Sequence, residues 1–354
     1  MPDDTSTVLL RPLVEGPSAW RGVELSRQPE KWIYRLSPPE IAELQAATAA
    51  ALSTGKPMLE ITRADFPLPT FGPRIEALRH ELLHGIGFQV LRGYPMAGRP
   101  IEENAMVFWG IGRHLGNPVS QNIRGHMLGH VRDAGKVAAI DPNVRASQST
   151  ERQFFHTDTC DVVGLLCLQT AKKGGESSVV SSMTVYNEMV RRRPDLAARL
   201  FEPVAFDRRG EIRDGEKGWY EIPVFNEHEG LLSVSFSGRS VNSACRFAGA
   251  LRNPQEAIDL FASIAEEQDL RLNMWLEVGD IQWVHNYTIL HDRTAYEDWP
   301  EPERKRHLLR LWIAAFGARP LPPIWKDRYG SIEVGNRGGV TNRHTTLKTP
   351  MADD

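Results

Sequence analysis

Residues 154–161, FFHTDTCD, place a histidine and an aspartate two positions apart, behind two phenylalanines and ahead of an apolar run. Side chains of an extended segment alternate between two faces, so His156 and Asp158 would point the same way and Thr157 the other way. A neutral imidazole and a carboxylate that converge from one strand can be two metal ligands. The alternative is a buried polar pair at a strand end, and these residues alone leave both interpretations open.

A second stretch, residues 285–312, offers a third ligand and a cation. His291 follows an apolar strand pair and opens a turn-rich, charged segment, the kind of place where a strand end presents a side chain to a cavity. Two histidines and one carboxylate leave three positions of an iron ion open, as non-haem Fe(II) oxygenases require. In the next strand Arg306 and Arg310 share one face. A guanidinium in so apolar a strand needs an anionic or hydrogen-bonding partner, and the carboxylate of a ligand would serve.

Composition limits the classes of protein. The 354 residues are 41% hydrophobic and 25% charged, which is typical of a globular chain, and the net charge of −3 argues against a nucleic acid partner. No apolar stretch is long enough for a membrane helix and the N-terminus lacks signal-peptide features, so we expect no membrane partner and a cytoplasmic location. Three cysteines without CxxC spacing argue against a disulfide framework. No repeat or linker divides the chain, which predicts one domain over residues 1–354.

Short strand-like runs prevail over helical ones in the second half of the chain. A helix should begin at Pro38, because Ser37 and Glu40 form a capping box. Further helical patterns cover residues 75–84, 183–192 and 253–267. Strand-like runs cover residues 87–95, 163–171, 177–182, 231–238, 274–286 and 306–316. Because strands and helices do not alternate regularly, we expect a mainly β protein with helical additions (α+β), an antiparallel sandwich or barrel.

The chain resembles the taurine dioxygenase (TauD/TfdA) family of Fe(II)- and 2-oxoglutarate-dependent oxygenases. The resemblance rests on HTD at 156–158, GGES at 174–177, NYTILHDRTAYED around His291 and RKRHLLRLW, which contains Arg310. It implies a double-stranded β-helix, or jelly roll, of the clavaminate synthase-like kind. It also divides the single domain into three parts: an N-terminal extension of about residues 1–86, a core of about 87–316 and a tail at 317–354. A helical insertion at about 184–275 would interrupt the core and lie over the barrel mouth.

The same resemblance implies roles for individual residues. His156, Asp158 and His291 would hold Fe(II), and Arg310 would pair with the distal carboxylate of 2-oxoglutarate. Ser177 stands just after GGE, where relatives such as taurine dioxygenase have a threonine that helps to hold the same carboxylate. Arg306 is a second cation for this anion site or, alternatively, half of a structural ion pair. With O2, such an enzyme oxidises an unactivated C–H bond, by default through hydroxylation, and releases succinate and CO2. Desaturation, cyclisation and epoxidation stay open.

The sequence says less about the substrate and the residues that contact it. Arg152, Gln121 and Asn122 are candidate polar contacts near the metal, although the same residues could be solvated or cap turns. We expect a small polar metabolite, for example an amino acid or a natural-product intermediate, and leave open a homodimer or homotetramer. Two other classes compete: a zinc hydrolase with a His2Asp site, and a noncatalytic binding protein or zinc-binding relative on the same scaffold. Arg310 argues against the hydrolase, and the complete set of ligands argues against a degenerate relative.

Overall fold

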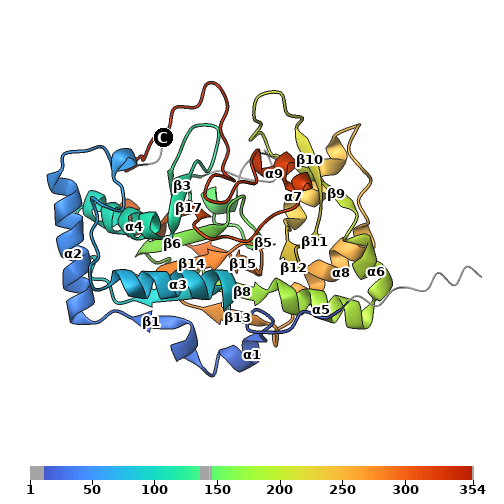
Figure 1. The fold of residues 1–354 in the computed structure, drawn as a ribbon, viewed down its shortest axis with the longest axis horizontal. Coiled ribbons are helices and arrows are strands. Elements are labelled where there is room, and N and C mark those ends of the chain that lie inside the picture. Colours follow the sequence, from blue (N-terminus) through green and yellow to red (C-terminus); the bar gives the residue numbers. More distant parts are fainter. Residues whose placement is uncertain (1–11, 136–142, 144–145, 353–354) are drawn as a thin grey trace, which may run out of the picture.

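Two β-sheets lie at the centre of the computed structural model, which describes residues 12–135, 143 and 146–352 (Figure 1). The larger sheet has the order β1 (Ile33–Arg35), β2 (Phe88–Arg92), β14 (Ile281–His285), β6 (Val162–Gln169), β17 (His307–Ala315) and β3 (Gly116–Val119), and β4 (Leu128–Val131) also pairs with β17. The smaller sheet has the order β13 (Arg271–Met274), β8 (Ser177–Ser181), β15 (Ile289–Arg293) and β5 (Gln153–His156). Within these two sheets all pairs are antiparallel except β1 with β2.

The two faces of the larger sheet have different neighbours. Leu309, Leu311 and Ile313 of β17 share a hydrophobic core with α2 (Pro38–Ser53), α3 (Gly72–His84) and α4 (Ile101–Leu115). Trp312 packs in another core with residues of β8 and β13, which belong to the smaller sheet. The side chains of β17 alternate between these two environments because the period of a strand is two. Arg310 shares the face of Trp312, so a cation is presented to the space between the sheets. This two-sheet core is the expected jelly roll.

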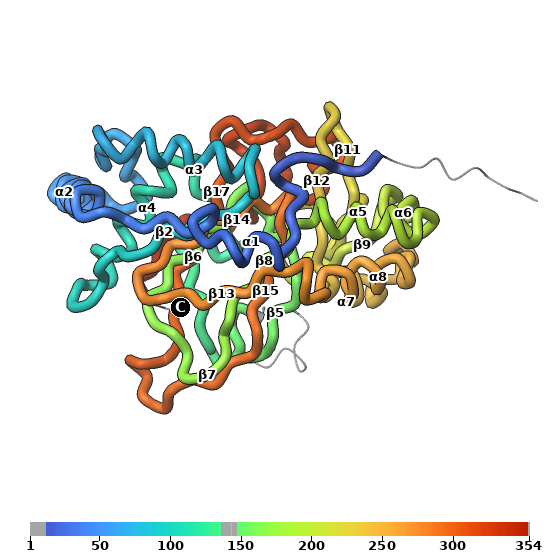
Figure 2. The backbone as a smooth tube through the Cα atoms, turned by 90° about the horizontal axis from the view of Figure 1, so that it is seen from below, coloured from blue at the N-terminus to red at the C-terminus, as the bar shows by residue number. Residues whose placement is uncertain are grey.

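Helices gather at the two ends of the sheets (Figures 1 and 2). On one side lie α2, α3 and α4; on the other lie α5 (Ser182–Arg192), α6 (Pro194–Arg199), α7 (Gly238–Ser243) and α8 (Gln255–Ala265). Two one-turn helices are α1 (Gly22–Leu25) and α9 (Lys326–Tyr329). The predicted start of α2 is confirmed, because the Glu40 carboxylate accepts a hydrogen bond of 2.8 Å from the Ser37 backbone N–H.

The stretch at 184–275, which we expected to be a helical insertion, is not purely helical. Besides α5 to α8 it contains two antiparallel pairs, β9 (Pro203–Asp207) with β10 (Trp219–Pro223) and β11 (Phe225–His228) with β12 (Leu231–Val234). Val204, Phe206 and Ile222 pack with α5 and α8 in a core that also includes residues of the smaller sheet. The expectation gave the helical signals too much weight, because the apolar residues of β9 and β10 recur with a period of two.

Residues 274–286, predicted as one strand-like run, form parts of two strands in different sheets. β13 ends at Met274 and β14 begins at Ile281. Between them Gly279 has a φ of +92°, and a Cβ there would lie 2.1 Å from the carbonyl oxygen of Tyr94. The Asp280 carboxylate then accepts hydrogen bonds from the Glu277 N–H and from Arg92. This turn lets the chain cross from one sheet to the other.

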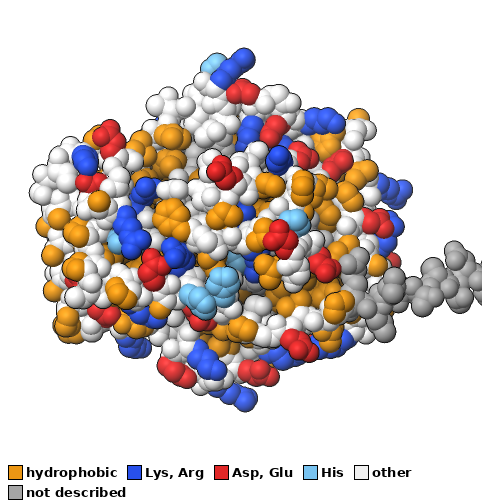
Figure 3. Space-filling view, in the orientation of Figure 1, with side chains coloured by type: hydrophobic (Ala, Val, Ile, Leu, Met, Phe, Trp, Pro, Cys, Tyr) orange, Lys and Arg blue, Asp and Glu red, His pale blue; other side chains and the backbone are white. Residues whose placement is uncertain are grey.

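The surface mixes charge types. On the face in Figure 3, acidic and basic side chains are interspersed with hydrophobic ones. Two short strands, β7 (Lys173–Gly174) and β16 (Tyr296–Glu297), pair at the edge of the molecule. Within the part of the chain that the structure describes, none of the helices combines the length and the apolar character needed to cross a membrane.

Candidate active site

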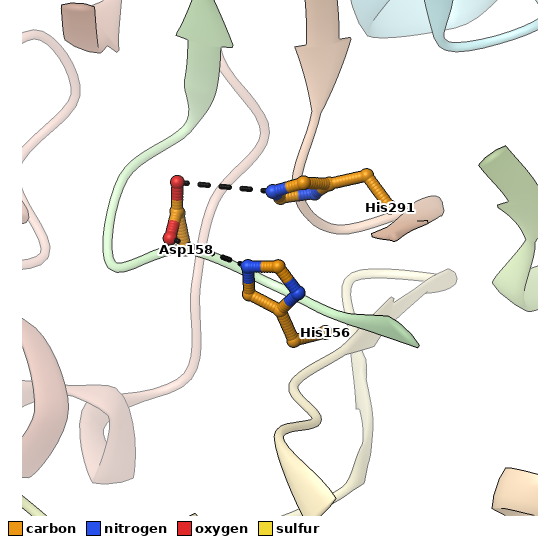
Figure 4. A group of neighbouring side chains, drawn as sticks. All are labelled: His156, Asp158 and His291. Atoms are coloured by element: carbon orange, nitrogen blue, oxygen red, sulfur yellow. Dashed lines mark ion pairs between the residues drawn. The ribbon is translucent and has the colours of Figure 1, made fainter. Parts of the chain in front are cut away.

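Strand pairing brings the three predicted ligands together (Figure 4). In the smaller sheet β15 runs antiparallel to β5, and His291 lies directly opposite His156. β5 ends at His156 because the Thr157 N–H turns away to the carbonyl oxygen of Phe236, and Asp158 follows in this turn. One Asp158 oxygen lies 3.8 Å from His156 Nε2 and the other 3.8 Å from His291 Nε2. One ligand atom from each residue lies within 4.8 Å of the others, as expected around a single ion.

The protonation states of the three side chains suit a divalent cation. Burial lowers the pKa of His291 to about 3, helped by the neighbouring His156, and burial also lowers the pKa of His156. Burial alone would raise the pKa of Asp158. The charges of Arg310 and the two histidines and the N–H of Trp312 outweigh it, so the carboxyl pKa lies below its ordinary value. Two neutral imidazoles and an ionised carboxylate are the donor set of non-haem Fe(II) oxygenases.

The tautomer of His156 is set by the backbone. Its Nδ1 lies 2.9 Å from the carbonyl oxygen of Phe154 and donates to it, which leaves the lone pair on Nε2. Nε2 is the atom that faces Asp158. The side-chain amide of Gln153 lies 2.8 Å from the same Nε2 and donates to it. The residues present therefore fit an iron ion.

Two neighbouring cavities border the three predicted ligands. The larger has a volume of about 1130 Å³, and its walls include His156, Asp158 and residues of the 184–275 stretch and the C-terminal segment. The smaller is lined by His291, Ser177, Arg293 and Arg306, among others. Ser147, Gln153 and Arg310 line both cavities, so the two spaces are neighbours beside the three predicted ligands.

The smaller cavity, with a volume of about 30 Å³, is lined by buried arginines. The Arg306 side chain is buried, and its Nη1 has no hydrogen-bond partner among the described residues. Burial lowers the pKa of Arg306, and it lowers that of Arg293 to about 10, with the charge of Arg306 as a further cause. Asp292 lines the same cavity and Asp298 acts on Arg306, but the unpartnered Nη1 leaves room for a further anion, because an incompletely compensated buried charge is costly. The buried hydroxyl-bearing residue Ser177 lines the same space.

Gln121 lies behind Arg310 and lines neither cavity among the residues described. Its Oε1 accepts from Arg310 Nε at 2.7 Å, and its Nε2 donates to the Arg310 carbonyl oxygen at 2.7 Å. Gly129 stands opposite Arg310 in the register of β4 and β17, and a Cβ there would come within 2.4 Å of Gln121 Oε1. The contacts of Gln121 therefore favour a role in orienting Arg310 over the substrate contact we expected.

Replacing Gln121 by leucine should weaken 2-oxoglutarate binding about tenfold while leaving Fe(II) binding unchanged. The substitution removes the acceptor for a charged donor, and such a hydrogen bond contributes about 1.5–3 kcal/mol. Titration of the anaerobic Fe(II) protein with 2-oxoglutarate measures the effect. Gln121→Glu keeps the acceptor and should retain most of the affinity, whereas equal loss in both variants would contradict the orienting role.

The other two polar candidates also have protein partners. Arg152 lines the larger cavity, where its guanidinium lies 2.7 Å from carboxylate oxygens of both Glu266 and Asp292. It thus braces α8 against the strand position next to His291, with its charge already compensated. The Oδ1 of Asn122 accepts from the backbone N–H groups of Arg124 and His126, so it caps a turn.

Sequence reasoning missed several residues of the site. Trp312 donates to Asp158 at 2.8 Å, and its place on the face of Arg310 was the available signal. Phe154 was not among them: it precedes the HTD motif and was expected near the pocket, and it is 63% exposed and lines the larger cavity next to His156. Arg328 and Arg239, from distant segments, line the same cavity. No local pattern marked these two arginines, because only packing brings their segments to the metal ligands.

Comparison with known proteins places this arrangement in a family. The family model described as "Taurine catabolism dioxygenase TauD, TfdA family" matches residues 52–312. FR-33289 synthase of Streptomyces rubellomurinus is 33% identical over 319 residues, which cover 89% of this chain and 94% of that protein. Taurine hydroxylase-like protein SAT17 of Stachybotrys chartarum is 31% identical, covering 83% and 77%. A uridine-5'-phosphate dioxygenase of Amycolatopsis sp is 27% identical over 174 residues, covering 47% and 62%.

Solved structures share the fold. Asparagine oxygenase in complex with Fe(II), 3-hydroxyasparagine and succinate superposes with a TM-score of 0.61 at 14% identity, covering 80% of this chain and 93% of that one. The oxygenase OrfP in complex with Fe and alpha-ketoglutaric acid gives a TM-score of 0.59 at 14% identity, covering 79% and 93%. The chain belongs to the TauD, TfdA family and is an Fe(II)- and 2-oxoglutarate-dependent dioxygenase.

Proposed function

We propose that this dioxygenase hydroxylates a small metabolite that carries a negatively charged group and binds in the larger cavity, while the distal carboxylate of 2-oxoglutarate reaches the smaller one. The observation that carries the proposal is the excess of arginine in the larger cavity, combined with the position of both cavities beside the three predicted metal ligands. A substrate in the larger cavity would then lie beside the metal on the side opposite to the smaller one.

The side chains of this protein would divide the work as follows. His156, Asp158 and His291 hold Fe(II), which when bound supplies the activation of O2 and the oxidation of 2-oxoglutarate. Trp312 keeps one Asp158 oxygen in place through its N–H. The walls of the larger cavity orient the substrate, and the C–H bond they bring to the metal decides the outcome.

The arginine contacts favour a different division of labour from the one expected from sequence. Arg310 Nη1 lies 3.7 Å from a metal-ligand oxygen of Asp158, so this guanidinium sits at the metal end of the smaller cavity. Arg306 lines that cavity with an unpartnered Nη1, beside Ser177. We therefore assign the distal carboxylate of 2-oxoglutarate to Arg306 and Ser177, and the metal-bound end to Arg310.

The charges of the larger cavity support an anionic substrate. Its described walls contain seven arginines and five acidic residues, and a bound Fe(II) ion would add further positive charge. Arg152 and Arg208 are ion-paired with carboxylates. Arg239, in the first turn of α7, is half-buried and has no ion-pair or hydrogen-bond partner in the described part of the chain. One relative is named for a phosphate ester, uridine 5′-phosphate, which is a substrate of this charge class.

A binding experiment tests the charge preference. We expect the anaerobic enzyme with Fe(II) and 2-oxoglutarate to bind uridine 5′-phosphate at least about tenfold more tightly than uridine in calorimetric titration. Loss of a charge-assisted hydrogen bond costs about 1.5–3 kcal/mol, so Arg239→Gln should weaken uridine 5′-phosphate binding about tenfold or more. Arg252→Gln, at an exposed arginine of the same 184–275 stretch, is the matched control. Equal affinity for the two compounds, or no effect of Arg239→Gln, would contradict the proposal.

A further inference from the structure

The turn that carries Asp158 is held by the C-terminal segment of the chain. We propose that residues 326–340, here called the C-terminal clamp, are part of the metal centre, and that Arg328 is a positioning residue for the Asp158 ligand. The clamp lies outside the residues 52–312 that the family model matches. The inference rests on the metal-binding role of His156, Asp158 and His291.

Four consecutive carbonyl oxygens of the turn accept hydrogen bonds from the clamp. Arg328 Nη2 donates to the oxygens of Thr157 and Asp158 at 3.1 and 3.0 Å. The Gly339 N–H donates to Thr159 at 2.9 Å, and the Tyr329 hydroxyl to Cys160 at 3.5 Å. Buried backbone groups need partners, and all four of these carbonyls find theirs in the clamp, so the clamp helps to hold the path of this turn.

Arg328 acts on the two peptide planes that flank Asp158. The carbonyl of Thr157 belongs to the plane before the Asp158 Cα and the carbonyl of Asp158 to the plane after it. Both oxygens are drawn to one rigid guanidinium, and the Asp158 N–H is held separately by Asn286 Oδ1 at 2.9 Å. With both planes held, the backbone dihedrals of Asp158 are determined, and so is the direction in which its carboxylate leaves the backbone.

The surroundings of Arg328 explain why this contact is strong. Its side chain is buried, and its hydrogen-bond partners are the two carbonyls and the hydroxyls of Thr157 and Ser235. No ion pair with a carboxylate is present for it among the described residues, so the buried charge is stabilised by these neutral dipoles. Removing the turn carbonyls from the cation would cost more here than at the surface, because water cannot replace them.

A second contact pins the far end of the turn. Arg337 Nε donates to Asp161 Oδ1 at 2.8 Å, and neither side chain is exposed. The other Asp161 oxygen accepts from the Ala315 N–H of β17 at 2.9 Å. Arg213, from the 184–275 stretch, donates to the Arg328 carbonyl oxygen at 2.9 Å and thereby ties that stretch to the clamp. Sheet, 184–275 stretch and clamp thus meet behind the metal ligands.

The test compares Arg328→Gln and Arg328→Lys with a matched control, Arg319→Gln. Arg319 also belongs to the C-terminal segment, and its side chain donates to a carbonyl, that of Leu232 at 2.6 Å. Its contact with the clamp is through its backbone carbonyl, which accepts from Arg337 and is kept in Arg319→Gln. Co(II) binding, followed by visible absorbance, reports on the metal site without turnover. Hydrogen exchange of the metal-free protein reports on the amides of residues 157–161.

We expect Arg328→Gln to raise the Kd for Co(II) by about 10–100-fold, the effect typical of residues that support metal ligands. Exchange at residues 157–161 should quicken, Arg328→Lys should recover part of the affinity, and Arg319→Gln should resemble the wild type in both measurements. A merely structural role would lower the thermal unfolding midpoint equally in Arg328→Gln and Arg319→Gln and leave the Kd unchanged.

The proposal is overturned if Arg328→Gln binds Co(II) as tightly as the wild type, or if Arg319→Gln weakens binding equally. If Arg328→Gln does not fold, the Kd of Arg328→Lys decides: an unchanged value refutes the positioning role and a raised value supports it. Failure of the wild type to bind Co(II) would instead refute the metal site itself. An error in the proposed substrate class would leave all these readouts untouched.

Discussion

Replacing His291 by alanine should weaken Fe(II) binding by at least about a hundredfold and abolish turnover of 2-oxoglutarate. His291 supplies one of only three protein ligand atoms, which lie within 4.8 Å of one another. Residues that merely support a metal ligand contribute about 10–100-fold to affinity, so loss of a ligand itself should reach at least the upper limit. Anaerobic Fe(II) titration and succinate release measure the two effects.

The control for this variant is another strand histidine of the same protein. His130, in β4, is half-buried and hydrogen-bonds through Nδ1 to His307 at 2.7 Å, away from the three ligands. His130→Ala should bind Fe(II) like the wild type, even if it unfolds at a lower temperature. Wild-type Fe(II) affinity in His291→Ala would show that the metal lies elsewhere.

Arg306→Met should raise the Kd for 2-oxoglutarate by about a hundredfold or more with little change in Fe(II) affinity. A bidentate pair between a guanidinium and a carboxylate contains two charge-assisted hydrogen bonds, each contributing about 1.5–3 kcal/mol. The ligand-free variant should unfold at the same temperature as the wild type or higher. The reason is that the substitution removes a buried charge whose Nη1 has no partner in the described structure.

Titration of the anaerobic Fe(II) protein with 2-oxoglutarate, followed by the visible charge-transfer band of the chelate, gives the affinity. Thermal unfolding with and without 2-oxoglutarate gives a second readout, since a ligand at 100 times its Kd stabilises the folded state by about 2.7 kcal/mol. Arg306→Lys keeps the charge without the planar fork, so its affinity for 2-oxoglutarate should lie between those of the wild type and Arg306→Met. Arg304→Met, at a largely exposed arginine two residues earlier, is the control.

The competing assignment has its own signature. If Arg310 holds the distal carboxylate, as expected from sequence, Arg310→Met should lose 2-oxoglutarate affinity while Arg306→Met retains it. Our assignment predicts the larger loss for Arg306→Met, and for Arg310→Met a loss accompanied by weaker metal binding. The second effect follows because Arg310 helps to keep Asp158 ionised. The two variants measured side by side therefore separate the alternatives.

Some features of this protein can be predicted from its sequence because the patterns that indicate them span only a few residues. The alternation of side chains in an extended segment placed His156 and Asp158 together, although β5 ends at His156 and Asp158 reaches the site from the turn. The start of α2 at Pro38 followed from a capping pattern three residues long. The strands of the 184–275 stretch were undervalued, because runs such as Pro203–Asp207 are short and stand between stronger helical patterns.

The sequence by itself determined the chemistry that this protein can perform: two histidines, one aspartate and following arginines in an order that predicts Fe(II) and 2-oxoglutarate. Only the tertiary structure decided which residues form hydrogen bonds with these side chains and with the turn that carries Asp158. Gln121 turned out to contact Arg310 and Arg328 to hold the Asp158 turn, contacts between positions more than 150 residues apart. Ligand types are properties of single residues and short strands, which periodicity reveals. A hydrogen-bond partner depends on which distant segment the packing of two sheets, an inserted stretch and a C-terminal clamp brings within 3 Å.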